Sequence, residues 1–194
     1  MQARFPLFST PIDLAHHYWK LLLLPTDTVV DATCGNGKDS LFLARLIPEG
    51  ILIALDVQQT ALDKAYQYLA ENLSSEQLTR IKLLLQSHAS FPPLARVKLI
   101  VYNLGYLPGG NKEITTQTAT TLSSLQAALT LLAPGGAVSL TCYPGHPEGK
   151  REEEALLEVV KTLPSAEWNI CYHQWTNRST SPSLLFIQKQ FIQS

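Results

Sequence analysis

The sequence has few cysteines and no excess of charge of either sign. Its 194 residues include three cysteines, Cys34, Cys142 and Cys171, and no Cys-x-x-Cys pair. This spacing argues against a disulfide framework and a zinc site, so we expect no metal. The 15 basic and 16 acidic side chains nearly cancel. Net charge therefore gives no case for nucleic-acid binding by the whole surface, and contact with RNA would need a local basic patch.

Long apolar runs are also missing. The longest, Leu21 to Leu24, is too short to cross a bilayer. The N-terminal stretch MQARFPLFSTP lacks the apolar core and small-residue cleavage site of a signal peptide. Hydrophobic residues nevertheless make up 45% of the chain, enough to drive folding at this length. We expect a soluble cytoplasmic protein without membrane association, folded as one domain over residues 1–194.

What the sequence does contain is a regular alternation of strand-like and helix-like segments. Short apolar runs predict five strands, at 28–33, 51–57, 81–87, 97–103 and 137–143. Apolar residues at helical spacing predict helices at 11–24, 38–47, 59–73, 115–133 and 150–163. Pro134-Gly135-Gly136 is expected to stop the helix at 115–133. Such alternation predicts a parallel sheet with helices on both faces and right-handed crossovers.

The last part of the chain changes character. Residues 167–175 and 182–191 are strand-like and are joined by the polar sequence TNRST, so they predict an antiparallel hairpin. A mostly parallel sheet that ends in such a hairpin resembles the Rossmann-like seven-stranded α/β sheet of class I methyltransferases. In this arrangement residues 11–24 form an N-terminal helix, and residues 28–194 form the core.

The stretch VVDATCGNGKDS, at 29–40, joins a strand that ends in an acid to a glycine-rich turn. Gly35, Asn36 and Gly37 tolerate left-handed backbone and allow a ligand to approach closely. The nicotinamide fingerprint requires a third glycine where Ser40 stands, which disfavours a dinucleotide. A plain tight turn with a capping acid remains the alternative. In class I methyltransferases, an acid at the place of Asp31 helps to position the methionine ammonium of S-adenosylmethionine. We count Asp39 with the same cofactor-binding turn.

Asp56 ends the second predicted strand and can accept hydrogen bonds from both hydroxyls of a ribose. It follows Gly37 at about the 20-residue spacing of a ribose-binding acid, which would suit NAD equally well. Val57 and Gln58 are expected to flank the adenine, and His88 is a further candidate for that pocket. The alternatives are a helix cap for Asp56 and an exposed loop position for His88.

The segment YNLGYLPGGNK, at 102–112, is dense in turn residues and follows the fourth predicted strand. Asn103 offers an amide oxygen to an incoming amine, and Tyr106 offers a ring face and a hydroxyl to a base. The loop resembles the N-P-P-Y loop of amino-group methyltransferases, with N-L-G-Y in its place. We expect Asn103 and Tyr106 to be catalytic. Substrate contacts are expected from Leu104, Gly105, Tyr106, Leu107, Pro108, Gly109 and Lys112, and Leu104 and Asn103 should also line the cofactor site.

Four motifs together resemble those of the small bacterial rRNA methylases: DATCGNGKDSLFLA, LDVQ, YNLGYLPGGNK and CYPGHPEGKREEEA. The resemblance covers nearly the whole chain and implies S-adenosylmethionine as cofactor and RNA as substrate. This family includes the tRNA methyltransferase that converts 5-aminomethyluridine, or its 2-thio form, to 5-methylaminomethyluridine at the wobble position. We expect that reaction here, with tRNA as partner. An rRNA base methyltransferase and an inactive cofactor-binding module are the alternatives.

The segment TCYPGHPEGK, at 141–150, is expected at the same rim. His146 is a candidate for substrate contact or proton relay, together with Glu148. Cys142 stands where RNA cytosine-5 methyltransferases carry a nucleophile. Their fourth-strand Pro-Cys pair is absent, so a buried hydrophobic role is the better interpretation.

Charged side chains at the rim are candidates for phosphate contacts: Lys112, Lys150, Arg151 and Arg178. Because the net charge is low, the tRNA must be bound locally, or a second subunit of a homodimer must contribute surface. The acidic run REEEALLE is interpreted as a helix start favoured by the helix dipole, without a further function.

Overall fold

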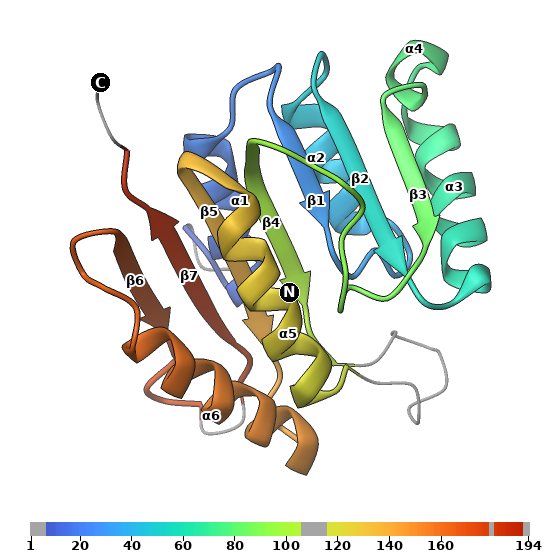
Figure 1. Cartoon of the computed structure of the whole chain (residues 1–194). Helices are drawn as coiled ribbons and strands as arrows, with labels where there is room; N and C mark the ends of the chain where they lie inside the picture. Colours follow the sequence, from blue (N-terminus) through green and yellow to red (C-terminus); the bar gives the residue numbers. More distant parts are fainter. Residues whose placement is uncertain (1–6, 106–115, 179–180, 192–194) are drawn as a thin grey trace.

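In the computed structural model, which describes residues 7–105, 116–178 and 181–191, a single sheet is covered by helices on both faces (Figure 1). The strands are β1 (Thr28–Asp31), β2 (Ile51–Asp56), β3 (Ile81–Leu85), β4 (Val97–Asn103), β5 (Leu132–Cys142), β6 (Trp168–His173) and β7 (Ser183–Lys189). The helices are α1 (Pro11–Leu22), α2 (Lys38–Leu46), α3 (Gln59–Asn72), α4 (Ser75–Leu78), α5 (Thr118–Leu131) and α6 (Pro147–Lys161).

The seven strands lie in the order β3-β2-β1-β4-β5-β7-β6. The first five are parallel, and β7 runs antiparallel to both β5 and β6. This confirms the predicted class I methyltransferase sheet with its C-terminal hairpin. The chain order reverses between β1 and β4, and ligands of open α/β sheets bind beyond the strand ends at such a switch point.

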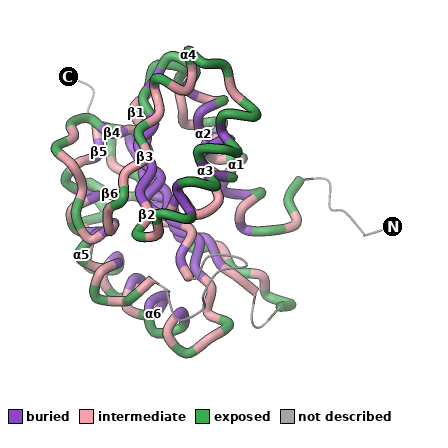
Figure 2. The backbone as a smooth tube through the Cα atoms, turned by 90° about the vertical axis from the view of Figure 1, so that its right-hand side faces the viewer, coloured by how far each residue is buried: buried purple, intermediate pink, exposed green. Residues whose placement is uncertain are grey.

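Successive residues of each strand point to opposite sides of the sheet. Because the central strands are apolar at successive positions, both faces of the sheet are apolar and are covered by helices. Val30, Ile100 and Val138 pack in one buried cluster with residues of α5 and α6. Their chain neighbours Val29 and Leu99 pack on the other face with α1 and α2. Figure 2 shows the buried positions concentrated along the strands. Both faces of the central strands are therefore buried, which explains their continuous apolar sequences.

The predicted junction between helix 115–133 and strand 137–143 was wrong in one respect. Pro134-Gly135-Gly136 does not separate the two elements, because α5 ends at Leu131 and β5 already includes Leu132. Leu132 pairs with Val97, and the register with β4 shifts before the next pair. Gly135 takes a left-handed φ of 69° inside this irregularity, as is common at strand bulges.

Two helix starts also differ from the prediction, and one helix was missed. Helix α5 begins at Thr118, three residues later than expected. Helix α6 begins at Pro147, three residues earlier than expected, because His146 caps it and proline is favoured in the first helical turn. The short helix α4 was not predicted, although Ser74 and Gln77 form a capping box that marks its start. Within the ranges that the structure describes, no helix has the length and apolar character needed to cross a membrane.

Candidate active site

The turn after β1 is tight because two of its residues have left-handed backbone. Gly35 has φ 52° and Gly37 has φ 78°. A Cβ on Gly37 would also lie 3.0 Å from Cα and Cβ of Ala65, because the start of α2 packs against α3 there. The turn therefore exposes backbone at the switch point, and a side chain at Gly37 would be both strained and crowded.

Asp31 lies below this turn and is fully buried. Its carboxylate accepts hydrogen bonds from the Ser40 hydroxyl at 2.6 Å and from the backbone N–H of Thr33 at 3.2 Å. Burial, with the neighbouring charge of Asp39, raises the pKa of Asp31 to about 7. With 1% of its surface exposed, Asp31 supports the turn from beneath and can act on a ligand only through other groups.

The carboxylate of Asp56 connects the end of β2 to the glycine turn. One oxygen accepts the backbone N–H of Gly35 at 2.9 Å, and the other accepts that of Gln58 at 2.9 Å. Each oxygen keeps a further lone pair for a ligand hydroxyl. The Asp56 carboxylate thus holds the N–H of Gln58, the residue before α3, without capping that helix, and retains the capacity to bind a ribose. Val57, next in the chain, leaves 55% of its surface exposed.

Asn36 carries an unpaired polar atom between the two glycines. Its side-chain oxygen is buried, and within the described ranges no donor hydrogen-bonds it. Buried acceptors are ordinarily paired, so this oxygen is a position where a ligand donor would restore a missing bond.

Asn103 ends β4 directly across the switch point from the glycine turn. The Thr33 hydroxyl accepts its backbone N–H at 2.7 Å, which ties the end of β4 to the segment after β1. The Asn103 side-chain nitrogen lies 3.4 Å from a carboxylate oxygen of Asp39, and the other oxygen of Asp39 lies 2.8 Å from Nε2 of His16. Asp39, predicted for the cofactor site, and Asn103, predicted for the acceptor, therefore lie next to each other.

Two residues of this group were missed by sequence analysis. His16 comes from α1, where it and the adjacent His17 stand before aromatic residues in a helix pattern that gives no functional signal. Tyr143 follows β5, and its hydroxyl lies beside the Asn103 side chain. Burial and the charge of Asp39 raise the pKa of Tyr143, so its hydroxyl stays protonated. The TCYPG sequence could have indicated Tyr143, which is the last residue of the strand predicted at 137–143.

Hydrogen bonds hold the chain at Leu104 and Gly105, directly after Asn103, and at Thr116, where the described chain resumes; we call the paired bonds between Gly105 and Thr116 the clamp. Leu104 is buried, and its N–H bonds the Thr141 carbonyl at 2.9 Å. Gly105, with φ 114°, donates its N–H to the Thr116 hydroxyl at 2.9 Å and accepts the Thr116 N–H at 3.1 Å. The predicted substrate residues between them, Tyr106, Leu107, Pro108, Gly109 and Lys112, lie outside the described residues.

Glu152 of α6 holds this clamp from below. Its two carboxylate oxygens accept hydrogen bonds from the hydroxyls of Thr116 at 2.9 Å and Thr121 at 2.6 Å. Burial raises the pKa of Glu152. The neighbouring Glu153 is buried as well and accepts a bond from Ser183. The interpretation of REEEALLE as an acidic helix start without further function was therefore wrong, because two of its acids face inward and join α5, α6 and β7.

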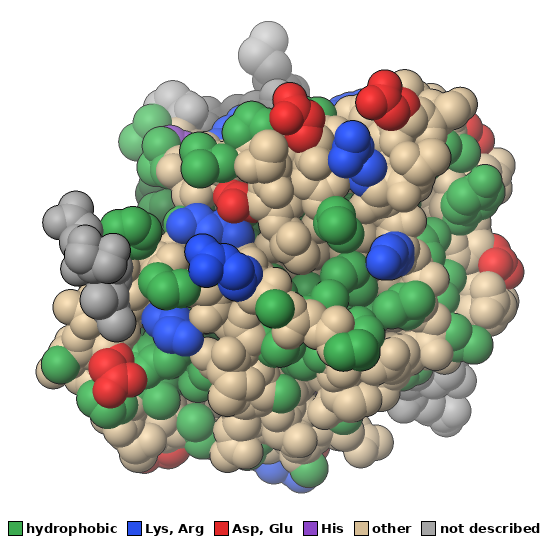
Figure 3. All heavy atoms as spheres, turned by 45° about the horizontal axis from the view of Figure 1, so that its top comes forward, with side chains coloured by type: hydrophobic (Ala, Val, Ile, Leu, Met, Phe, Trp, Pro, Cys, Tyr) green, Lys and Arg blue, Asp and Glu red, His purple; other side chains and the backbone are tan. Residues whose placement is uncertain are grey.

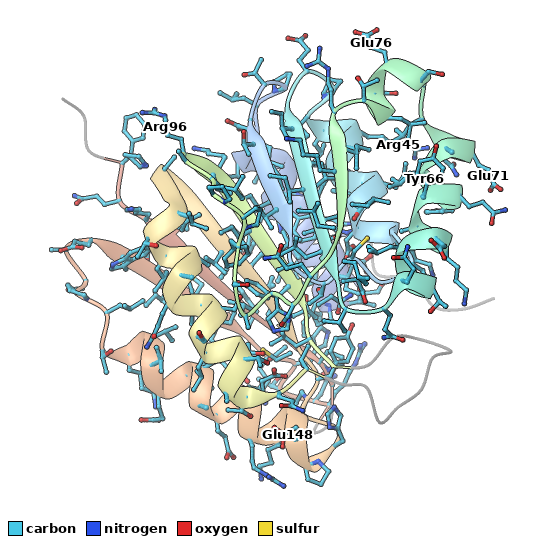
Figure 4. The ribbon with its side chains drawn as sticks, turned by 45° about the vertical axis from the view of Figure 1, so that its right-hand side comes forward. Arg45, Tyr66, Glu71, Glu76, Arg96 and Glu148 are labelled. Atoms are coloured by element: carbon cyan, nitrogen blue, oxygen red, sulfur yellow. The ribbon has the colours of Figure 1, made fainter. Side chains whose placement is uncertain are left out.

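The remaining predicted residues take structural positions at the same edge. His88 is buried rather than exposed. Its ring lies 3.5 Å from the Thr121 hydroxyl and edge-on to Tyr102, and burial lowers its pKa. His146 caps α6, its Nδ1 accepting the N–H of Gly149 at 3.1 Å. Glu148, labelled in Figure 4 at the start of α6, accepts bonds from Thr118.

Three of the four basic side chains predicted for phosphate contact lie in the described ranges, and each forms a surface interaction. Lys150 and Arg151 pair with Glu154 and Glu148 on exposed helix surface, and Arg178 donates to the Ser9 carbonyl at 3.3 Å. Figure 3 shows the end of the sheet that lies away from the glycine turn. Lys and Arg side chains on this face lie beside acidic and apolar side chains. Within the described ranges, no cluster of His, Cys, Asp and Glu could hold a metal ion.

Cys142 is buried in β5, with 2% of its surface exposed. Burial, with the charges of Glu153 and Glu152, raises the pKa of its thiol well above the ordinary range, so the thiolate needed for attack on a pyrimidine is disfavoured. We expect Cys142→Ala to retain turnover close to that of the wild type. Removal of a covalent nucleophile would instead lower kcat by on the order of a millionfold. Single-turnover assays on the two proteins distinguish these results.

Comparisons with protein families, with characterised relatives and with solved structures all point to the same family. A family model described as "Putative rRNA methylase" matches residues 52–189. The tRNA (mnm(5)s(2)U34)-methyltransferase, chloroplastic, of Arabidopsis thaliana is 38% identical over 92% of this chain and 69% of its own length.

Solved structures agree with the sequence comparisons. A "putative rRNA-methylase" from Clostridium thermocellum superposes with a TM-score of 0.88 at 32% identity, over 94% of this chain and 98% of that chain. A methyltransferase of Streptococcus mutans, SMU.1697c, solved in complex with SAH, has a TM-score of 0.81 at 31% identity, over 94% and 99% of the two chains. The chain therefore belongs to the rRNA methylase family of class I S-adenosylmethionine-dependent methyltransferases.

Proposed function

We propose that this enzyme N-methylates the 5-aminomethyl group of the wobble uridine in tRNA, converting 5-aminomethyl-2-thiouridine to its 5-methylaminomethyl form. The observation that carries the proposal is the position of Asn103, whose amide lies beside the Asp39 carboxylate and across from the glycine turn. This arrangement offers an acceptor oxygen and a negative charge to an amine. The Arabidopsis relative, named for that wobble nucleoside, supports the choice of substrate.

The residues around the glycine turn suit S-adenosylmethionine, which supplies a methyl group bonded to a sulfonium. Asp56 would accept the ribose hydroxyls with its remaining lone pairs, and exposed Val57, beside Gln58, would cover the adenine. The backbone of Gly35 and Gly37 and the unpaired oxygen of Asn36 would face the methionine part. Asp31 would support this turn from beneath, and buried His88 would back the adenine side of the pocket.

On the acceptor side, the chain has to present a neutral amine in line with the methyl group. The bound ammonium first loses one proton to water. Asn103 would then accept an N–H of the amine and orient its lone pair. The nitrogen would then bond to the methyl carbon that S-adenosylmethionine supplies, as the carbon–sulfur bond breaks and its electron pair stays on sulfur. The product ammonium then releases a second proton to water, so no covalent enzyme intermediate is needed.

The substrate residues predicted at 106–112 and the contact predicted for His146 belong to the same proposal. Tyr106 would pack on the uridine, and the backbone at Leu104 and Gly105 would line its pocket. His146 caps α6, and its contact with the substrate stays a prediction. The expected cytoplasmic location and homodimer remain predictions.

Mass spectrometry of tRNA nucleosides from a deletion strain tests the proposal. We expect the wobble uridine to lose one methyl group and to accumulate the aminomethyl form, with recovery when the wild-type gene is returned. Purified enzyme should methylate the accumulated tRNA. An unchanged tRNA profile together with a methyl group missing from rRNA would refute the proposal in favour of rRNA modification.

A further inference from the structure

Asp39 is a partly buried carboxylate whose one ion-pairing partner in the described part of the chain is a histidine. Its side chain is 16% exposed and lies on the first turn of α2. One oxygen contacts His16 Nε2 at 2.8 Å and the other faces the Asn103 amide nitrogen at 3.4 Å. The salt bridges of the described residues give Asp39 no lysine or arginine. A carboxylate removed from water in this way is stabilised when a cation pairs with it.

His16 holds this carboxylate in a defined orientation. Its ring stacks on Phe42, with ring centroids 3.8 Å apart and planes 14° apart, and it also contacts Trp19 at 4.8 Å. The imidazole therefore has little freedom to turn. Because Phe42 and Asp39 both belong to α2, His16 connects α1 to the rim of the site and acts as a positioning residue.

Asp39 also fixes which end of the Asn103 amide is free. With the amide nitrogen directed at Asp39, the amide oxygen remains available as an acceptor. The Asp39 carboxylate and this oxygen together match two N–H groups of one primary ammonium. A neutral hydroxyl offers only one donor and no charge, and an amine that carries its own carboxylate would be repelled.

We propose that Asp39 is the specificity-determining carboxylate that binds the acceptor as a primary ammonium, with His16 as its positioning residue. This inference rests on the proposed function and deepens it. The sequence alone grouped Asp39 with the cofactor-binding turn, and the methionine part of the cofactor also carries an ammonium. The contact with Asn103, at the end of β4, places Asp39 on the acceptor side, and the experiment separates the two ammonium groups.

Asp39→Asn keeps the shape of the side chain and removes its charge. We expect kcat/KM for tRNA carrying 5-aminomethyluridine to fall at least about thirtyfold, the range for loss of one partner of a desolvated charge pair. Calorimetric affinity for S-adenosylhomocysteine should stay within about threefold, since that ligand would not depend on this charge. Wild-type enzyme should reject tRNA whose aminomethyl group has been acetylated. Asp63→Asn, an exposed carboxylate on α3 that bonds only its helix neighbour Gln59, is the matched control.

His16 is tested by a pair of variants with a KM-against-kcat readout. His16→Ala should raise KM for the aminomethyl tRNA about tenfold with a smaller change in kcat, because the carboxylate loses its orienting partner. His16→Gln should restore most of the loss, since its amide can donate to Asp39. Equal losses in both variants, or a loss confined to thermal stability, would mean that the ring serves packing alone.

The possible outcomes are distinct. A parallel loss of S-adenosylhomocysteine affinity in Asp39→Asn would assign the carboxylate to the cofactor and overturn the inference, as would unchanged kcat/KM with active wild type. Should Asp39→Asn fail to fold, Asp39→Ser provides the same readouts. Wild-type enzyme that binds tRNA carrying 5-aminomethyluridine through Asp39 without methylating it would refute the proposed function alone. Wild-type enzyme that neither binds nor methylates it would refute both.

Discussion

Asn103→Ala is expected to lower kcat/KM for aminomethyl tRNA by on the order of a hundredfold to a thousandfold, the range for one group that orients the reacting atoms. Affinity for S-adenosylhomocysteine should change little, because the glycine turn and Asp56 are held by bonds that do not involve the Asn103 side chain. The backbone bond from Asn103 to Thr33 also survives the substitution. Steady-state kinetics with purified tRNA and calorimetry with the product cofactor measure the two effects.

Asn169→Ala is the matched control for this experiment. Asn169 is exposed on β6, at the far edge of the sheet from the glycine turn, so the same change of side chain should leave both quantities unaltered. Turnover in Asn103→Ala equal to that of the control would remove Asn103 from the reaction. Cofactor affinity reduced as much as turnover would make Asn103 a cofactor ligand instead.

Glu152→Ala is expected to destabilise the fold by about 2 kcal/mol, because the Thr121 hydroxyl is fully buried and would lose its acceptor. For a chain of this length, this corresponds to a fall in Tm of roughly 4–8 °C. Turnover should also fall at temperatures where the variant is still folded. The reason is that Glu152 accepts a bond from Thr116, which in turn holds the N–H of Gly105. Thermal denaturation and tRNA methylation measured on the same preparation separate the effects.

Glu152→Gln provides the control and the pH dependence. The amide retains one acceptor and can donate to a threonine hydroxyl, so we expect most of the stability to return. Burial raises the pKa of Glu152 in the folded protein, so the folded state binds this proton more tightly than the unfolded state does. The contribution of Glu152 to stability is therefore complete below its unfolded pKa and declines as pH rises through the folded value. A wild-type advantage over Glu152→Gln that grows as pH rises would contradict this account.

The fold was predictable because its signals are local and repeated. Each central strand is apolar on both faces, and the polar TNRST link leaves room only for a hairpin. The junction before β5 was not predictable, because the pairing of Leu132 with Val97 is a contact between distant parts of the chain. Proline and glycines ordinarily mark a turn between two elements. Here the pairing of Leu132 with Val97 starts β5 before them and includes them in the strand.

The candidate site was predictable where a motif lies at a strand end, as for Asp56 and Asn103. Its supporting residues were not, because they reach the site from elsewhere in the fold. His16 contacts a carboxylate 23 positions away, and Glu152 bonds threonines 31 and 36 positions away. His146 also has a structural role that its loop-like sequence did not indicate, because its ring caps α6. Spacing in a sequence identifies ends of strands, whereas inward-facing polar pairs depend on how helices pack.

The reciprocal bonds between Gly105 and Thr116 have a consequence for how this enzyme can change over evolutionary time. Because Gly105, after β4, and Thr116, before α5, bond each other, changes of sequence or length between them need not displace β4 or α5. If residues 106–115 bind the substrate as proposed, target recognition can diversify while the residues around the glycine turn stay intact. Under that proposal, chimaeras that exchange only residues 106–115 between relatives should inherit the target preference of the donor sequence.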